Sequence, residues 1–120
     1  MRCRPDQLYY NSITEMWLCN GQPVLDEMVE VSRLVIDFVE KLRLPRDEIY
    51  DKFLEQYEII EDMVTLYPKK TPKIVALGFI AFNSNLGFKV IGEKLGIKWD
   101  TVAYAYKRYF QAMASAGLLE

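Results

Sequence analysis

The sequence predicts an all-α fold, a bundle of five helices that ends in a helix-turn-helix. Three observations support this prediction. Apolar residues recur at steps of three and four along most of the chain, which is the spacing of one face of a helix. Proline or glycine stands where each of these runs stops. A chain of 120 residues that is 51% hydrophobic is long enough to enclose one core.

Residues 1–23 are expected to form an extension before the main domain, with at most one short helix over 6–19. The apolar stripe of that helix would consist of Leu8, Tyr9, Ile13, Met16 and Trp17. Asn20, Gly21 and Pro23 then break the chain. The main domain would occupy residues 24–120.

Two long helices are expected to open the main domain. Apolar residues from Val24 to Leu42, with acidic residues between them, predict an amphipathic helix over 24–43. Pro45 ends it, because proline disfavours helical geometry in the residue before it. Pro45 also suits the first turn of a second helix, predicted over 46–64.

The third helix is expected at the centre of the bundle. Thr71 and Pro72 are typical of an N-cap followed by proline in the first turn. Residues 72–84 are apolar on nearly every side, as in a helix that others surround. The residues expected to be most deeply buried are Ile74, Leu77, Ile80 and Ala81. A buried strand is the alternative for such a short apolar run.

The segment 88–112 is typical of a helix-turn-helix. A two-turn helix over 88–95 precedes Gly96, a residue type that ends helices in the left-handed conformation. A second helix is expected over 100–116, capped by Asp100 or Thr101. The side chains expected to face inward are Val90, Ile91, Leu95, Ile97, Val102, Ala105, Tyr106 and Tyr109.

The outer face of this second helix is the candidate DNA-binding surface. In a helix-turn-helix the start of the second helix enters the major groove, and cations in adjoining segments contact phosphates. The candidates on or beside that helix are Lys98, Trp99, Thr101, Tyr104, Lys107 and Arg108. Those for flanking phosphates are Lys69, Lys70 and Lys89. The alternative is a helical corner that serves only to pack the bundle.

The charge distribution favours the first interpretation, although the net charge of −2 alone does not. Residues 1–65 contain seven Lys and Arg against fourteen Asp and Glu, for a net charge of −7. Residues 66–120 contain eight basic and three acidic residues, for a net charge of +5. The half that contains the helix-turn-helix is therefore the basic one, as nucleic-acid binding requires.

Other function classes find little support in the sequence. The chain has no histidine, which removes the commonest general base and metal ligand, and no glycine-rich phosphate loop. We therefore expect neither an enzyme nor a bound metal or cofactor. Cys3 and Cys19 match no zinc module and are expected to be free thiols, although they could pair. No apolar run reaches the ~20 residues of a membrane-spanning helix, so we expect a cytoplasmic, nucleoid-associated protein, or one acting in a host cell if its source is viral.

The order of segments over residues 24–113 resembles one cyclin-like repeat of the archaeal transcription factor B and eukaryotic TFIIB family. The resemblance rests on the junction Glu40-Lys41-Leu42-Arg43-Leu44-Pro45-Arg46, the buried helix from Thr71-Pro72, and the closing Ile91–Ile97 and Thr101–Lys107. It implies a cyclin-like bundle of five helices around a central one. It also implies that the helix-turn-helix contacts promoter DNA beside a TATA-box-binding protein or another transcription protein.

The chain departs from that family in three ways. Its two cysteines cannot build the family's N-terminal zinc ribbon, only one repeat is present, and Phe79 and Phe82 make the central helix bulkier. A stand-alone regulator from a virus, plasmid or archaeal genome therefore fits better. Two alternatives stay open: a protein-interaction module without DNA binding, and a winged-helix regulator that lacks the wing.

Overall fold

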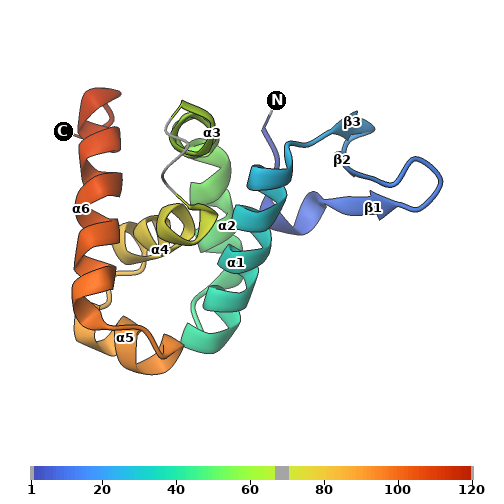
Figure 1. Ribbon diagram of the computed structural model, residues 1–120. Helices are drawn as coiled ribbons and strands as arrows, with labels where there is room; N and C mark the ends of the chain where they lie inside the picture. The colour runs from blue at the N-terminus through green and yellow to red at the C-terminus, as the bar shows by residue number, and fades with distance from the viewer. Residues whose placement is uncertain (1, 67–70, 120) are drawn as a thin grey trace.

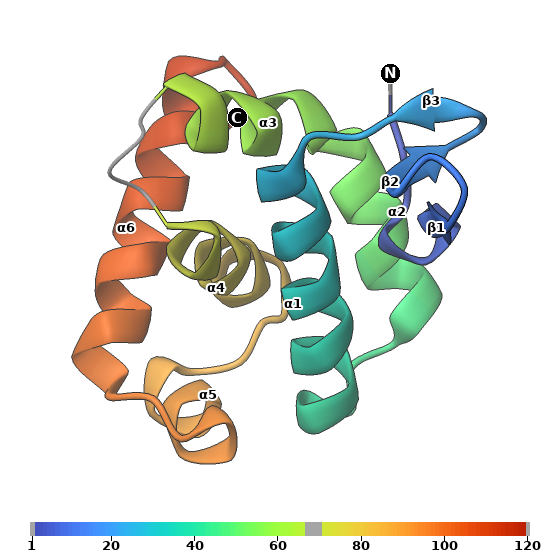
Figure 2. The ribbon, with the colours of Figure 1, turned by 45° about the vertical axis from the view of Figure 1, so that its right-hand side comes forward.

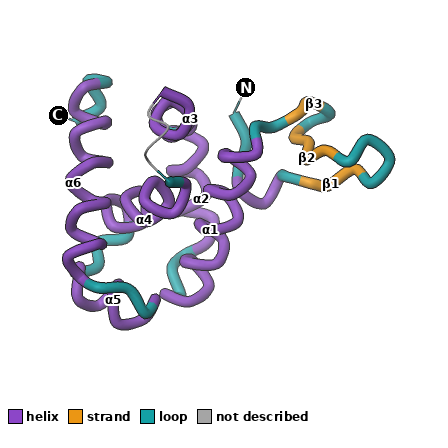
Figure 3. The backbone as a smooth tube through the Cα atoms, viewed as in Figure 1, coloured by secondary structure: helices purple, strands orange, loops and turns teal. Residues whose placement is uncertain are grey.

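The computed structural model describes residues 2–66 and 71–119 (Figure 1). In chain order the elements are a 3-10 helix Pro5–Gln7, strands β1 Tyr9–Asn11, β2 Met16–Cys19 and β3 Gln22–Pro23, and helices α1 Asp26–Leu42, α2 Arg46–Glu55, α3 Tyr57–Leu66, α4 Pro72–Asn83, α5 Phe88–Leu95 and α6 Trp99–Ser115. Figure 3 shows that the strands are confined to the N-terminal end of the described chain. No helix of the described residues is both long and apolar enough to cross a membrane.

Helix α4 lies at the centre, with α1 on one side and α6 on the other (Figure 2). Leu77, Ile80 and Ala81 are buried as predicted, whereas Ile74, in the first turn, is only half-buried. The contact between α4 and α6 is close at Gly78, where a Cβ atom would lie 2.5 Å from the Ala105 carbonyl oxygen. A side chain at this position would separate the two helices, so glycine sets how closely α6 approaches the core.

The prediction of an all-α bundle of five helices is wrong. The described chain contains a three-stranded antiparallel sheet and six α-helices. Instead of one short helix, residues 6–19 form the end of the 3-10 helix and then a hairpin over 9–19. Tyr10 pairs with Trp17 across the two strands, and their rings meet edge to face at 5.6 Å. Such aromatic pairs stabilise antiparallel strands. The same aromatic residues had the spacing of a helix, which short segments do not distinguish from a strand.

Two local signals turn the chain within this sheet. The Asn11 side-chain oxygen accepts hydrogen bonds from the amides of Ile13 and Thr14 at 2.9 and 3.2 Å, which starts the connection to β2. Asn20 and Gly21 both have positive φ, at 51° and 80°, and join β2 to β3. Asn-Gly is the preferred pair for a two-residue hairpin turn. The prediction of a simple chain break at Asn20 and Gly21 is therefore incomplete, because this pair forms the turn between β2 and β3.

Cys3 and Cys19 form a disulfide rather than free thiols, with their Cα atoms 6.4 Å apart. Both residues are buried, so the bond ties the N-terminal segment to β2 from within the core. Sequence spacing did not show this pairing, because it depends on the hairpin that brings residue 19 back to residue 3. Arg4 adds a second tie, with ion pairs at 2.8 Å to Asp47 and Asp51 on α2.

The helix predicted over 46–64 is divided at Gln56, where φ of −100° and ψ of 10° end α2 before α3 begins. The Gln56 side chain turns inward and is buried. It exchanges two hydrogen bonds with the Asn83 amide, at 2.9 and 3.1 Å, and accepts a third from the Tyr109 hydroxyl. These three tertiary hydrogen bonds offset the backbone hydrogen bonds that are lost where the helix is interrupted. The apolar periodicity of 46–64 does not predict them.

Candidate nucleic-acid interface

The corner between α5 and α6 is a three-residue turn, Gly96-Ile97-Lys98. Gly96 has φ of 68°, in the left-handed region that glycine adopts without strain, and ends α5 as the sequence predicts. The Ile97 amide donates back to the Gly92 carbonyl at 2.9 Å. Figure 1 shows α5 lying across the lower end of α6. The short turn and the crossed helices are the geometry of a helix-turn-helix.

A second glycine makes this corner tight. A Cβ atom on Gly92 would lie 2.5 Å from the Ile97 carbonyl oxygen and 3.3 Å from the Trp99 nitrogen. Contacts that close are repulsive, so the end of α5 meets the start of α6 only because residue 92 has no side chain. The sequence carries this glycine, but nothing in its periodicity shows that it faces the turn.

Helix α6 begins one residue earlier than expected, and its N-cap is Lys98 rather than Asp100 or Thr101. The amides of Thr101 and Val102 both donate to the Lys98 carbonyl, which places Asp100 and Thr101 inside the first turn. Asp100 does not cap the helix, contrary to the prediction, and is exposed on its outer face. Its carboxylate is a negative charge within the candidate surface.

The inner face of the corner is mostly as expected. Ile91, Val102, Ala105 and Tyr109 are buried. Leu95, Ile97 and Tyr106 are half-buried against the core. Val90 differs, since 41% of it is exposed. It adjoins the exposed Lys89 on the outer side of α5 and adds apolar surface there.

The candidate residues on α6 fall into two strips along the helix. Trp99 and Lys107 share one strip at four-residue steps, whereas Thr101, Tyr104 and Arg108 share another at steps of three and four. Trp99 and Arg108 are nine residues apart, which places them on opposite sides of the helix at about 3.6 residues per turn. Lys107 and Tyr104 lie between these two edges.

Two cation–aromatic contacts occur on this surface. The Lys89 ammonium of α5 lies 6.0 Å from the Trp99 ring centroid. The Arg108 guanidinium lies 5.9 Å from the Tyr104 ring centroid. Each pair keeps a positive charge beside an aromatic face, an attractive arrangement. Lys89, predicted to contact flanking phosphate, is therefore close to Trp99, while Lys69 and Lys70 lie outside the described residues.

The exposed part of this surface has a distinct composition. Trp99 and Tyr104 are 54% and 51% exposed, and Lys89, Lys98 and Lys107 are exposed as well. Within residues 2–66 and 71–119, none of the three lysines takes part in an ion pair. The surface thus combines unpaired cations with large aromatic rings.

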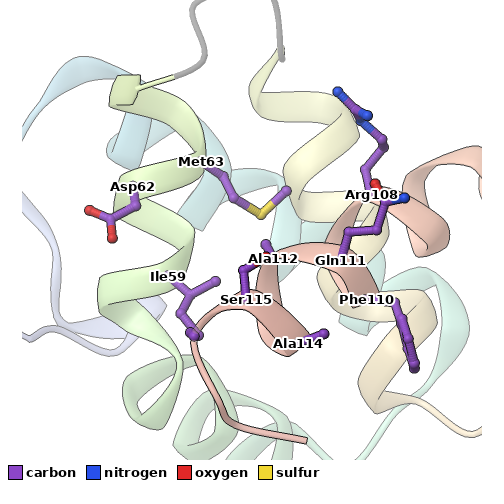
Figure 4. Close-up of a pocket in the computed structure, with 10 residues that line it drawn as sticks. Ile59, Asp62, Met63, Arg108, Phe110, Gln111, Ala112, Ala114 and Ser115 are labelled. Carbon is purple, nitrogen blue, oxygen red and sulfur yellow. The ribbon is translucent and has the colours of Figure 1, made fainter.

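Arg108 and Thr101 are less accessible, since both are half-buried. Arg108 borders a groove of about 700 Å³ between α3 and α6. Its Nε atom is buried and has no hydrogen-bond partner among the described residues. Figure 4 shows Ile59 and Met63 pointing from α3 toward α6, and Asp62 pointing away. Arg108 therefore lies at the edge of the candidate surface, not at its centre.

No protein-family model, no curated protein and no solved structure matches this chain. The resemblance to the transcription factor B family accordingly stays a prediction from the sequence.

Proposed function

We propose that this chain binds double-stranded DNA through the outer face of α6 and acts as a transcription regulator. One observation carries the proposal: Trp99 and Tyr104 are about half exposed on the first turns of α6, beside Lys98 and Lys107. Packing of the bundle does not require two large aromatic rings to be half exposed to solvent, whereas a binding surface does.

The chemistry of this face suits the major groove. Lysine ammonium groups neutralise phosphates, and this term supplies most of the affinity for any sequence. Tyr104 offers a hydroxyl that can hydrogen-bond a base edge or a phosphate, and aromatic rings contact the thymine methyl group. Asp100 works against phosphate binding and accepts hydrogen bonds from the cytosine amino group, so it favours some sequences over others.

The proposed protein partner is a TATA-box-binding protein or another transcription protein. This part of the proposal rests on the resemblance of residues 24–113 to the transcription factor B family. The acidic surface of α2 and α3, with exposed Asp47, Asp51, Glu55 and Glu58, is the side available to such a partner while α6 contacts DNA.

The test is a titration of the chain into labelled random-sequence duplexes, followed by fluorescence anisotropy at 50 and 200 mM salt. We expect affinity to fall with salt, with each phosphate contact adding ~0.9 to the slope of log affinity against log salt. Replacing Lys98 and Lys107 with alanine should flatten the slope by about two contacts. Lys52→Ala on α2 is the control and should leave it unchanged. A wild-type affinity independent of salt would assign the corner a purely structural role.

A further inference from the structure

The N-terminal hairpin, residues 9–23 and here called the hairpin arm, projects from the helices on the side away from α6 (Figures 1 and 2). Its base is held firmly. The Cys3–Cys19 disulfide is buried beneath it, and the Arg33 guanidinium of α1 lies 5.6 Å from the Trp17 ring centroid. A projecting arm held in this way presents its surface without the cost of being ordered on binding.

The outer part of the hairpin arm is unusually apolar for an exposed turn. Ile13 is 92% exposed at the tip, and Tyr9 and Tyr10 are 47% and 50% exposed on β1. Met16 is exposed at the start of β2. Neighbouring exposed apolar side chains of this kind mark an association surface.

The charge of this region indicates which partner it fits. Residues 7–25 contain one charged side chain, Glu15, and no lysine or arginine. Without cations the hairpin arm has nothing to neutralise a nucleic acid or an anionic membrane surface. The exposed acidic residues of α2 and α3 repel a second copy that approaches from that side. The hairpin arm, in which Glu15 is the one charged residue, is a place where two copies meet with much less repulsion.

The two edges of the sheet differ in how readily each could pair with a strand of a second copy. The strand order β1-β2-β3 leaves β1 and β3 as edges within the described chain. Pro23 lies on β3 and has no amide to donate, which protects that edge. Strand β1, with the sequence Tyr9-Tyr10-Asn11, has no proline and no charge. Its length of three residues limits pairing, but the backbone groups on its free edge can pair with another strand.

We propose that the hairpin arm is a self-association site at which two copies of this chain pair through their β1 strands. Antiparallel pairing about a twofold axis places Tyr10 opposite its own counterpart and Tyr9 opposite Asn11 of the second copy. This proposal does not depend on DNA binding.

The dimer should be weak. A tyrosine buries about 150–250 Å² when fully covered, and both tyrosines here are already half-buried. With Ile13 and Met16 the contact is smaller than the roughly 800 Å² per partner of a stable interface. A dissociation constant of roughly 10–500 µM is expected.

Sedimentation equilibrium of the full chain without DNA, from about 10 µM to 1 mM, tests the proposal. The average mass should rise from 14.1 kDa toward twice that value. The double variant Tyr9→Lys/Ile13→Lys places like charges beside the twofold axis and should raise the dissociation constant at least about tenfold. Leu118→Lys, which changes a residue after α6 that is about as exposed as Tyr9, is the control and should associate like the wild type.

A second measurement guards against a double variant that fails to fold. In the wild type, the β1 amide protons that point away from β2 should exchange more slowly at 1 mM than at about 10 µM, since pairing with a second β1 protects them. A wild type that stays at 14.1 kDa throughout, or a folded double variant that associates like the wild type, would overturn the proposal. A protein that stays monomeric and instead pellets with phosphatidylcholine vesicles would also overturn the proposal. Failure of DNA binding would leave this result untouched.

Discussion

The Tyr109 hydroxyl donates a hydrogen bond to the side-chain oxygen of Gln56, and so joins α6 to the point where α2 and α3 separate. Both residues are buried, and burial raises the pKa of Tyr109 well above its usual value, so the hydroxyl stays protonated and able to donate. This bond links the candidate DNA-binding helix to the acidic half of the molecule.

Replacing Tyr109 with phenylalanine should destabilise the fold by about 0.5–1.5 kcal/mol, because one hydrogen bond is lost while Asn83 continues to donate to Gln56. Gln56→Leu should cost more, about 2–4 kcal/mol, since it leaves both the Tyr109 hydroxyl and the Asn83 amide without that partner. Urea unfolding of the two variants checks the order. Variants that are both as stable as the wild type would mean that the bonds to Gln56 contribute nothing.

Gly92→Ala should open the corner between α5 and α6. The added methyl group would meet the Ile97 carbonyl oxygen at 2.5 Å, so the turn must shift, at a cost of about 1–3 kcal/mol. Gly87→Ala is the control, since among the described residues no atom beyond its two chain neighbours lies within 4 Å of its Cβ position. Thermal unfolding should separate the two variants, and DNA affinity should fall only in Gly92→Ala. A fully stable Gly92→Ala protein would contradict the tight corner.

These two sites show what the sequence predicts and what it does not. Gly96 and the apolar spacing of α4 and α6 are local signals, and the helices appear where those signals place them. Gln56 and Gly92 depend on partners distant in sequence or on the angle of a turn, so neither has a periodic signature. The prediction for residues 6–19 failed for another reason, because Tyr9, Tyr10 and Trp17 fit a helical stripe and a strand pair equally. The sequence signal that favours strands is Asn20-Gly21, the turn that follows β2.

The candidate surface was partly predictable for similar reasons. The sequence places Trp99, Tyr104 and Lys107 on the outside of α6, and their exposure confirms that placement. The prediction that Asp100 or Thr101 caps α6 is wrong, because the N-cap position depends on where the turn ends and not on residue type alone. Arg108 is half-buried since α3 packs beside it, which helical spacing cannot show.

Asp100→Asn should increase DNA affinity by roughly threefold at low salt for all sequences except any that pair with the carboxylate. The change removes a negative charge from the exposed face and keeps the size of the side chain. Anisotropy titrations at two salt concentrations measure the gain. Unchanged affinity would place DNA away from the first turn of α6.

Arg4 should make the stability of the fold depend on pH in the acid range. Its hydrogen bond lowers the pKa of Asp47 below the ordinary 3.8, so this contribution is present above that value and is lost as pH falls through the lower, folded pKa. Unfolding of the wild type and of Arg4→Met should be compared between pH 2 and 6. The difference in stability should shrink toward the acid end, and a difference constant with pH would contradict the ion pair.

The two tryptophans can report directly whether the outer face of α6 binds DNA. Trp17→Phe leaves Trp99 as the sole tryptophan, and Trp99→Phe leaves Trp17 on β2 of the hairpin arm, which projects on the side away from α6 (Figure 1). Each variant is titrated with duplex DNA while acrylamide quenching of its emission is measured. If the outer face of α6 binds DNA, Trp99 becomes protected from acrylamide at saturation and Trp17 stays as accessible as in the free protein. DNA binding that leaves Trp99 fully accessible, or that protects Trp17 instead, would contradict the account.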